Sequence, residues 1–485
     1  MDNYNSVLLQ SIVFCMLGLN DTICAPATLP GTGAITLIRV SGPEAFAVTD
    51  RVFRCSRGTV REASAYSVLY GTIIDEASVQ DKVVDEVLVS VFRAPHSYTG
   101  EESVEISCHA SSYIASRVLA LLCAAGARLA EPGEFTRQAF VNGKMDLAQA
   151  EAVADVISSS SSASHRVAMN QLKGGYSAEL ASIREALVEI TSLLELELDF
   201  SEEEVEFADR SRLRSLLVSA SGRVRALSDS FRLGNAIKNG VPVAIVGEPN
   251  VGKSTLLNAL VGDDRALVSD IAGTTRDSIE EHVTLDGIDF RFIDTAGLRE
   301  SSELVEKMGM DRTWKMLSEA DIVLAVVDAT DSPAASSAFL KTLTDRMDFD
   351  SQQLVVLVNK IDCNKNVNDI NNLVSFAGNQ SFVLDISALT GAGLPQLRET
   401  LAGLVRARFQ GSSESILVTN ARHHEALRLA ADALDAALTS LSSGVPSDLI
   451  AQDLRTALYH LGTITGAISN DEVLGVIFSR FCIGK

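Results

Sequence analysis

The eight residues from Gly247 to Ser254 constrain the fold of this 485-residue chain more than any other stretch. They read G-x-x-x-x-G-K-S and lie between an apolar run, Val243 to Val246, and an apolar helical segment that begins at Leu256. In such a loop the glycines let backbone N–H groups wrap phosphates at a helix N-terminus, the lysine reaches the β- and γ-phosphates, and the serine hydroxyl ligates Mg²⁺. The motif alone predicts a nucleotide-binding α/β domain for ATP or GTP.

Further motifs, each placed after an apolar run, decide which base is bound. Asp294 to Gly297 places a carboxylate near Mg²⁺ and a glycine N–H near the γ-phosphate, and Ser387 to Leu389 offers backbone N–H groups to guanine O6. In the segment from Asn359 to Asp362, the last carboxylate can accept both N1–H and N2–H₂ of guanine. Adenine presents an acceptor at N1 and is repelled. The motifs therefore predict a GTP-binding domain, with contacts at Asn250, Val251, Gly252, Lys253, Ser254, Thr255, Asp294, Thr295, Ala296, Gly297, Asn359, Lys360, Asp362, Ser387 and Ala388.

The hydrolytic machinery departs from that of many small GTPases. Thr275, in the segment Gly273 to Asp277, is predicted to complete the Mg²⁺ shell with Ser254. Leu298 stands where those enzymes carry a glutamine, so a more distant group must align the attacking water. Positive charge at the transition state can come from a partner's arginine or a monovalent cation. Asn250 suits such a cation through its side-chain carbonyl, or is only a turn residue after proline.

Composition narrows the class of protein without deciding its partner. Subtracting 63 acidic from 41 basic residues gives a net charge of −22. This charge excludes a protein that binds nucleic acid through positive charge spread over its whole surface. Between Glu179 and Arg210, 11 acidic and 2 basic residues carry 9 of these excess negatives, so a nucleic-acid contact elsewhere stays open. Seven scattered cysteines without a C-x-x-C pair argue against a disulfide framework or a zinc site. The apolar run from Ile12 to Leu19 is too short to span a bilayer, and we expect a cytoplasmic protein.

Three regions with different patterns of apolar residues predict the domains of the chain. Residues 21–140 read as a compact α+β domain, in which Ser103 to His109 alternates with Val104, Ile106 and Cys108 on one face. Residues 141–238 and 409–485 read as two halves of an all-α helical domain with leucines at helical spacing. Between them, residues 239–408 carry the short apolar runs of a buried parallel sheet. The predicted fold is thus multidomain, with an α/β P-loop domain inserted into a helical domain, after an extension of residues 1–20. The serine run Ser158 to Ser162 is interpreted as a polar helix surface.

Outside the GTPase motifs, several stretches are distinctive: Asp21-Thr22-Ile23 with Ala27-Thr28 and Gly31, Ser97 to Glu101, Glu131 to Thr136, Asn142 to Leu147, and the terminal Cys482-Ile483-Gly484-Lys485. Through these stretches and the GTPase motifs, the sequence from about Asp21 to Lys485 resembles the MnmE (TrmE) family of tRNA-modification GTPases. The resemblance implies a folate-binding and dimerising N-terminal domain and a FAD-dependent partner of the MnmG (GidA) type, which together form a heterotetramer. The implied reaction adds an aminomethyl-type (carboxymethylaminomethyl) group to carbon 5 of the tRNA wobble uridine. The one-carbon donor is a tetrahydrofolate derivative, 5-formyl- or 5,10-methylene-tetrahydrofolate.

The resemblance also implies site residues. Potassium would be held by Asn250, the carbonyls of Ser269 and Ile271, and Thr274, in a loop that also contains Asp270, Ala272 and Gly273. Glu306 would orient the water, which makes Glu306, Lys253, Asn250 and Thr275 the catalytic set. Folate would contact Arg39, Glu86, Lys144 and Lys485, because a pterin suits a carboxylate and the glutamate tail of folate suits cations.

Several of these residues have simpler interpretations, and one rival function stays open. Arg39 and Lys144 can be exposed charges, Lys485 a frayed terminus, and Cys482 a packing residue. His109 is interpreted as a polar position on a strand face instead of a catalyst, and the Ala110 that follows it departs from the family's glycine. The rival function is a ribosome-assembly or signalling GTPase switch, which would need a basic or KH-like RNA-binding appendage. The sequence has neither.

Overall fold

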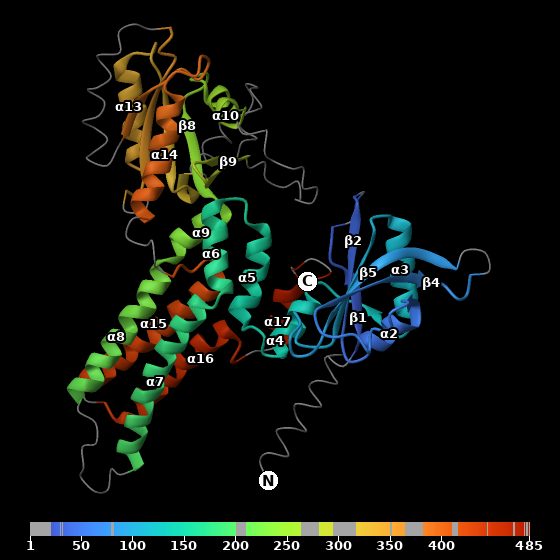
Figure 1. Cartoon of the computed structure of the whole chain (residues 1–485). Helices are drawn as coiled ribbons and strands as arrows, with labels where there is room; N and C mark the ends of the chain where they lie inside the picture. Colours follow the sequence, from blue (N-terminus) through green and yellow to red (C-terminus); the bar gives the residue numbers. More distant parts are fainter. Residues whose placement is uncertain are drawn as a thin grey trace. The chain divides into compact units, whose positions relative to one another are not determined.

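A computed structural model describes two compact units, residues 1–154 with 462–485, and residues 155–461 (Figure 1). Within them, the described residues are 21–29, 31, 33–78, 82–199, 210–262, 281–293, 317–349, 352–363, 382–409, 416–443, 445–468, 471–479, 481 and 484. The multidomain fold, with α+β, helical and α/β parts, is confirmed. The tail from Gly462 groups with the N-terminal residues, whereas the exact domain boundaries stay predictions. No helix within the described ranges is both long enough and apolar enough to cross a bilayer.

A seven-stranded mixed sheet forms the centre of the first unit, in the order β3-β4-β5-β6-β2-β1-β7. Its strands are β1 (Ile23–Pro26), β2 (Ile35–Ser41), β3 (Phe53–Arg54), β4 (Ser67–Ile74), β5 (Val83–Phe92), β6 (Ser103–His109) and β7 (Arg128–Leu129). The alternation predicted for β6 is confirmed, because Val104, Ile106 and Cys108 are all buried. These side chains pack in one core with those of α2 (Ala45–Val52) and α3 (Ser112–Ala124). On the opposite face, Ile23 and Ala25 of β1 are buried with Phe135, whereas Tyr70 of β4 and Leu88 of β5 are exposed.

A smaller apolar cluster in the first unit joins segments that are far apart in sequence. Helices α4 (Glu134–Val141) and α5 (Leu147–Ser158) contribute Phe140, Leu147 and Ala150. The C-terminal helix α17 (Asp471–Ser479) contributes Phe478, and Phe481 follows it. The last turns of the chain are therefore held by residues about 330 positions earlier, with φ of +69° at Gly133 allowing the approach.

The second unit contains the predicted parallel sheet, in the order β13-β12-β11-β8-β10-β9. Its strands are β8 (Val241–Gly247), β9 (Glu281–Leu285), β10 (Ile288–Phe292), β11 (Ile322–Asp328), β12 (Gln353–Asn359) and β13 (Phe382–Asp385). All neighbours are parallel except β9 and β10, which form a hairpin. Strands β8, β11 and β12 are almost entirely buried, because side chains from α10 (Lys253–Gly262), α13 (Pro333–Thr344) and α14 (Leu394–Phe409) share the two cores on either side of the sheet.

Helices make up most of the rest of the second unit, and the last of them continues past its end at Leu461. They are α6 (Ser162–Leu172), α7 (Gly175–Asp199), α8 (Arg210–Asp229), α9 (Phe231–Asn239), α15 (Ala421–Ser442) and α16 (Ser447–Thr465), and α8 packs against both α7 and α15. The predicted apolar stripe of α7 is buried at Leu180, Ile183, Leu187, Ile190 and Leu194. Its acidic side chains face arginines: Glu179 pairs with Arg223 at 2.9 Å, Glu189 with Arg212 at 3.6 Å, and Glu195 with Arg455 at 2.5 Å.

The interpretation of the serine run as a helix surface is wrong. Helix α5 ends at Ser158 and α6 begins at Ser162, so the serines form the turn between them. Ser161 caps α6 by accepting a hydrogen bond from the Ser164 amide at 3.2 Å. Ser160 donates to the buried Asp289 of the β9–β10 hairpin. Short hydroxyls favour this turn because they satisfy helix-end N–H groups that a continuous helix does not expose.

Candidate functional site

The phosphate-binding loop follows β8 and leads directly into α10. Two of its residues have left-handed backbone angles, Asn250 with φ of +64° and Gly252 with φ of +99°. At Gly247 a Cβ atom would lie 2.5 Å from the Val326 carbonyl of the neighbouring strand. The glycines of the motif are therefore required by the loop's path as well as by phosphate approach.

Lys253 directs its ammonium group into this loop. Its Nζ donates to the carbonyls of Gly247 at 2.8 Å and Glu248 at 2.7 Å. Burial lowers the pKa of Lys253 and the nearby Glu248 carboxylate raises it, with a net lowering. Phosphate oxygens are stronger acceptors than carbonyls, so the ammonium group lies where a bound triphosphate would attract it.

Asn359, at the end of β12, forms hydrogen bonds with two other loops, the phosphate loop and the loop that contains Ala388. Its Nδ2 donates to the Val251 carbonyl at 2.7 Å, and its Oδ1 accepts from the Ala388 amide at 2.9 Å. The side chain is 2% exposed, and a Cβ at Gly252 would collide with its Nδ2. The phosphate loop, the Asn359–Asp362 segment and the Ser387–Ala388 segment thus form one assembly at the carboxyl edge of the sheet, where an open α/β sheet binds its ligand.

The carboxylate predicted to read guanine lies beside this assembly. Asp362 is exposed and accepts a hydrogen bond from the buried Ser387 hydroxyl at 2.6 Å. That bond, with a smaller contribution from Cys363, lowers the pKa of Asp362. The carboxylate therefore stays ionised and keeps an oxygen for a donor edge such as that of guanine.

The remaining predicted GTPase residues lie outside the described residues, as does the end of the chain. They are Ser269, Asp270, Ile271, Ala272, Gly273, Thr274, Thr275, Asp294, Thr295, Ala296, Gly297, Glu306 and Lys485. Of the predicted metal ligands, Asn250 and Ser254 are described, and both lie on the phosphate loop or the first turn of α10. The water-orienting and switch roles stay predictions.

Two of the predicted folate residues contact the loop from Pro95 to Gly100 in the first unit, Arg39 from β2 and Lys144 from the segment after α4. The Arg39 guanidinium lies 5.0 Å from the centre of the Tyr98 ring and pairs with Glu105 at 2.8 Å. Lys144 donates from Nζ to the Pro95 carbonyl at 2.9 Å. Two cationic side chains therefore contact this loop, of which Arg39 is already paired with Glu105. A cation next to such a loop suits an anionic group.

The third predicted folate residue, Glu86, lies apart from these two. It accepts a hydrogen bond from the Tyr70 hydroxyl at 2.7 Å, which raises the pKa of that phenol. Arg39 pairs with Glu105 in register, and Glu105 with Ser90, so Glu86 is four residues along β5 and two strands away. With about 3.4 Å per residue and about 4.8 Å per strand, the backbones at Arg39 and Glu86 are roughly 16 Å apart.

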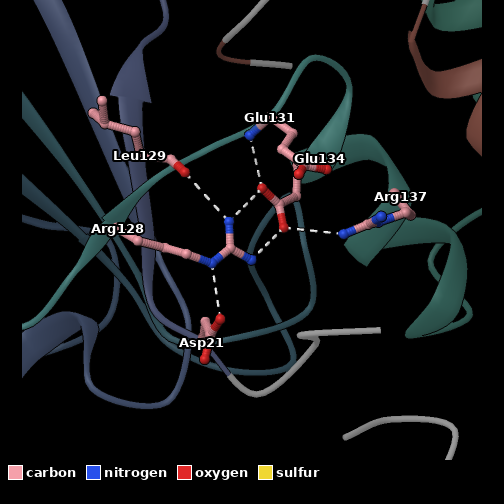
Figure 2. A network of polar contacts seen from close by, with 6 residues as sticks. All are labelled: Asp21, Arg128, Leu129, Glu131, Glu134 and Arg137. Atoms are coloured by element: carbon pink, nitrogen blue, oxygen red, sulfur yellow. Dashed lines mark hydrogen bonds and ion pairs between the residues drawn. The ribbon is translucent and has the colours of Figure 1, made fainter. Parts of the chain in front are cut away.

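A buried ionic network lies under the segment from Glu131 to Thr136 (Figure 2). Glu134 is 1% exposed and accepts from Arg128 at 2.6 and 2.9 Å, from Arg137 at 3.0 Å and from the Glu131 amide at 2.8 Å. Burial opposes its ionisation, but these bonds together outweigh burial, so the pKa of Glu134 is lowered. The network fixes the turn at Gly133, where a Cβ would lie 2.6 Å from the Phe478 carbonyl of the C-terminal helix.

Comparison with known families covers both units. The family model described as "GTP-binding protein TrmE N-terminus" matches residues 22–144 of the chain, and the family model described as "MnmE helical domain" matches residues 147–482. The chain belongs to the MnmE family. It is therefore a GTP hydrolase, in agreement with the guanine-selective motifs assembled in the second unit.

Full-length relatives give the same result. A protein of Bacteroides fragilis named "tRNA modification GTPase MnmE" is 47% identical over 471 residues, which are 96% of this chain and 99% of the relative. A protein of the same name from Bacteroides thetaiotaomicron is 48% identical over 470 residues, with the same coverage. Among solved structures, the G domain of the FeoB iron transporter of T. maritima is 29% identical and covers 34% of this chain and 97% of that chain, with a TM-score of 0.25. A superposition this loose adds nothing to the assignment.

The structure also places one residue at the MnmE nucleotide site that the motifs do not include. Asp328, at the end of β11, accepts from Lys360 Nζ at 2.6 Å and from the Thr330 amide at 2.8 Å. Lys360 in turn donates to the Asn250 carbonyl at 2.8 Å. Burial raises the pKa of Asp328, but these bonds outweigh it and the net direction is a lowering. The signal was available in sequence, because Asp328 ends an apolar strand as the motif residues do.

Proposed function

We propose that this MnmE-family chain uses K⁺-stimulated GTP hydrolysis to drive modification of C5 of the tRNA wobble uridine. A FAD-dependent partner of the MnmG type and a tetrahydrofolate one-carbon donor complete the reaction. The observation that carries the proposal is the pair of family matches, which together cover the N-terminal unit and the helical segments that flank the GTPase motifs. A GTPase domain alone would be compatible with many functions. The relatives' printed name supplies tRNA as the substrate class.

The phosphate loop supports the ions that this proposal needs. Asn250 combines a left-handed backbone with a carbonyl held by Lys360, so the residue is fixed next to the phosphate position. Its amide oxygen suits an alkali cation, and the Ser254 hydroxyl suits Mg²⁺. When bound, these ions neutralise charge that develops on the phosphates. In the proposal, Ser269, Ile271 and Thr274 complete the K⁺ site, Thr275 the Mg²⁺ shell, and Glu306 aligns the water.

The open face of the N-terminal sheet supports a folate site. Arg39 and Lys144 at the Pro95–Gly100 loop suit the anionic tail, and Glu86, roughly 16 Å from Arg39, suits the donor edge of a pterin. This separation fits an extended ligand with unlike ends. A folate so bound would supply the one-carbon unit, while the chain's residues bind and orient it, with Lys485 proposed as a further contact.

Exposed apolar side chains on the same face support the homodimer. Tyr70 and Leu88 are paired across β4 and β5 and are 61% and 47% exposed, and Val68 and Ile35 are 58% and 65% exposed. Side chains of this size on one sheet face are typical of a surface that is covered in an assembly. The proposal places the dimer, with two copies of the partner, in the cytoplasm.

The test is nucleoside mass analysis of tRNA from cells that lack the gene. We expect the C5-modified wobble uridine to disappear and to return when the wild-type gene is restored. Unchanged wobble uridines would refute the modification function and leave the GTPase intact. The rival ribosome-associated switch would then be favoured if the protein co-sedimented with ribosomes in a GTP-dependent manner.

A second measurement tests the cation separately. GTP hydrolysis by the purified chain should be much faster in KCl than in NaCl at equal ionic strength, because the two ions differ in radius. Equal rates in the two salts would remove K⁺ from the proposal without affecting the tRNA assignment.

A further inference from the structure

Two consecutive residues at the end of β12 hold two consecutive carbonyls of the phosphate loop. Asn359 donates to the Val251 carbonyl at 2.7 Å, and Lys360 donates to the Asn250 carbonyl at 2.8 Å. In a trans peptide the C=O and the N–H point in opposite directions. The two donors therefore set the direction of the N–H groups that a phosphate loop offers to its ligand.

Each of these two residues is anchored from a different strand. The Asn359 side chain also accepts from the Ala388 amide at 2.9 Å. Lys360 is paired through Nζ with Oδ2 of Asp328, the last residue of β11, at 2.6 Å. The side chains of Asp328 and Lys360 are 9% and 35% exposed. Because the pair is shielded from water, its attraction is weakened less than that of a surface pair.

Asp328 has little freedom to move. Its other carboxylate oxygen accepts from the Thr330 amide at 2.8 Å and from the Thr330 hydroxyl at 2.7 Å. Its backbone is in register with Asn359 in the parallel ladder between β11 and β12. The next bond of that ladder runs from the Ala329 amide to the Asn359 carbonyl at 2.8 Å. Asp328 therefore offers Lys360 a fixed partner.

The residue at the other end of these contacts needs such support. Asn250 has φ of +64°, in the left-handed region, which costs free energy for any residue except glycine and least for asparagine and aspartate. A residue in that region keeps its conformation only when its surroundings hold it there. The direction of the Asn250 side chain depends on this backbone. Its amide oxygen is the ligand that the proposed function gives to K⁺.

We propose that Asp328 is a positioning residue for the cation. It holds Lys360, Lys360 holds the Asn250 backbone, and the Asn250 amide oxygen is thereby placed for K⁺. The inference rests on the K⁺ part of the proposed function. Phosphate binding depends on Asp328 less, because the Val251 carbonyl is held by Asn359, whose side-chain bonds do not involve Asp328.

The experiment compares Asp328→Ala with the wild-type full-length chain. Titration of GTP hydrolysis with K⁺ at constant ionic strength should show a half-activating concentration raised about 3- to 30-fold, the range for one link in a contact network. Tl⁺, which resembles K⁺ in radius and is observed by thallium NMR, should bind the complex with GDP and fluoroaluminate more weakly by a similar factor. The dissociation constant of a fluorescent GDP analogue, measured in NaCl, should change by less than about threefold.

Three further variants separate positioning from a general loss of stability. Asp328→Asn keeps an oxygen that can accept from Lys360 and should recover most of the wild-type K⁺ dependence. Lys360→Ala breaks the same set of contacts, so adding Asp328→Ala to it should raise the half-activating K⁺ concentration no further. Asp331→Ala removes an exposed carboxylate three residues further along the chain and should leave every readout unchanged.

Two results would overturn the inference. One is a half-activating K⁺ concentration for Asp328→Ala within about threefold of the wild-type value. The other is a GDP affinity that falls by the same factor as the Tl⁺ affinity, because the whole loop would then be disturbed. If the wild-type chain hydrolyses GTP equally fast in KCl and NaCl, the K⁺ part of the proposed function fails instead, and Asp328 has no cation to position.

Discussion

The nucleotide loops and the N-terminal sheet face solve the same problem, the placement of polar side chains, in different ways. At the nucleotide site, residues from three loops bond to one another's backbone, as when Asn359 joins Val251 to Ala388. On the N-terminal face, each candidate side chain is paired locally, Arg39 with Glu105 and Glu86 with Tyr70. A parallel sheet gathers its motifs at one edge, whereas a largely antiparallel sheet spreads them over a surface. The first arrangement fixes a ligand by the path of the chain, and the second by a few separate contacts.

The largest effect should come from the buried network in Figure 2, which supports only the N-terminal side of this comparison. Glu134→Ala leaves Arg128 and Arg137 without their shared buried carboxylate, which should cost about 3–5 kcal/mol of local stability. Amide hydrogen exchange of β1 and β2 should therefore accelerate at least 100-fold, while GTP affinity stays unchanged. The neighbouring Glu131→Ala, in which only an exposed side chain is lost, is the matched control. A fall in GTP affinity with Glu134→Ala would break the comparison, because the two regions would then be coupled.

A smaller effect is expected at the nucleotide loops. Gly252→Ala places a side chain at φ of +99° and against Asn359, which should cost about 1–3 kcal/mol and weaken GTP binding about 5- to 150-fold. Gly262→Ala, at the last residue of α10, meets no atom within 4 Å and should leave binding unchanged. The measurement is the dissociation constant of a fluorescent GTP analogue. Equal affinities for the two variants would mean that the Asn359 bridge does not hold the phosphate loop.

The smallest effect concerns Glu101 in the N-terminal unit, whose ionisation should make the stability of the folded chain depend on pH. Burial, with a contribution from the charge of Glu134, raises the pKa of Glu101 to about 7, although bonds from Ser41 and Asn142 oppose it. The folded chain therefore keeps a proton that the unfolded chain releases near pH 4.3, and stability falls as pH rises from about 4.5 to 7. Glu101→Gln removes this loss, so the variant should be more stable than wild type at pH 8 by about 1 kcal/mol, allowing for partial exposure, and equal to it near pH 4.5. Urea unfolding curves at the two pH values provide the measurement. A constant difference at both pH values would contradict the assignment.

The same contrast explains how much could be predicted from sequence. The four strands that carry or border the motifs of the second unit lie where their apolar runs place them, and Asp362 meets Ser387 as the guanine site requires. The strands of a parallel sheet are buried on both faces, so each one appears in the sequence as a continuous apolar run. Because the strands are parallel, the residues that follow these runs lie at the same edge of the sheet. Glu86 and Arg39 could be assigned to one site only through family resemblance, because their separation depends on sheet order. The serine turn, by contrast, had a local signal, the capping box formed by Ser161 and Ser164, which the helical interpretation overlooked.

The arginines that face α7 change how the protein's charge should be understood. The segment from Glu179 to Arg210 contributes 9 of the 22 excess negative charges, yet three of its carboxylates lie against guanidinium groups from α8 and α16. Beyond a Debye length of about 8 Å at physiological salt, each such pair looks almost neutral. A polyanion approaching this side would meet weaker repulsion than the isoelectric point of the chain suggests.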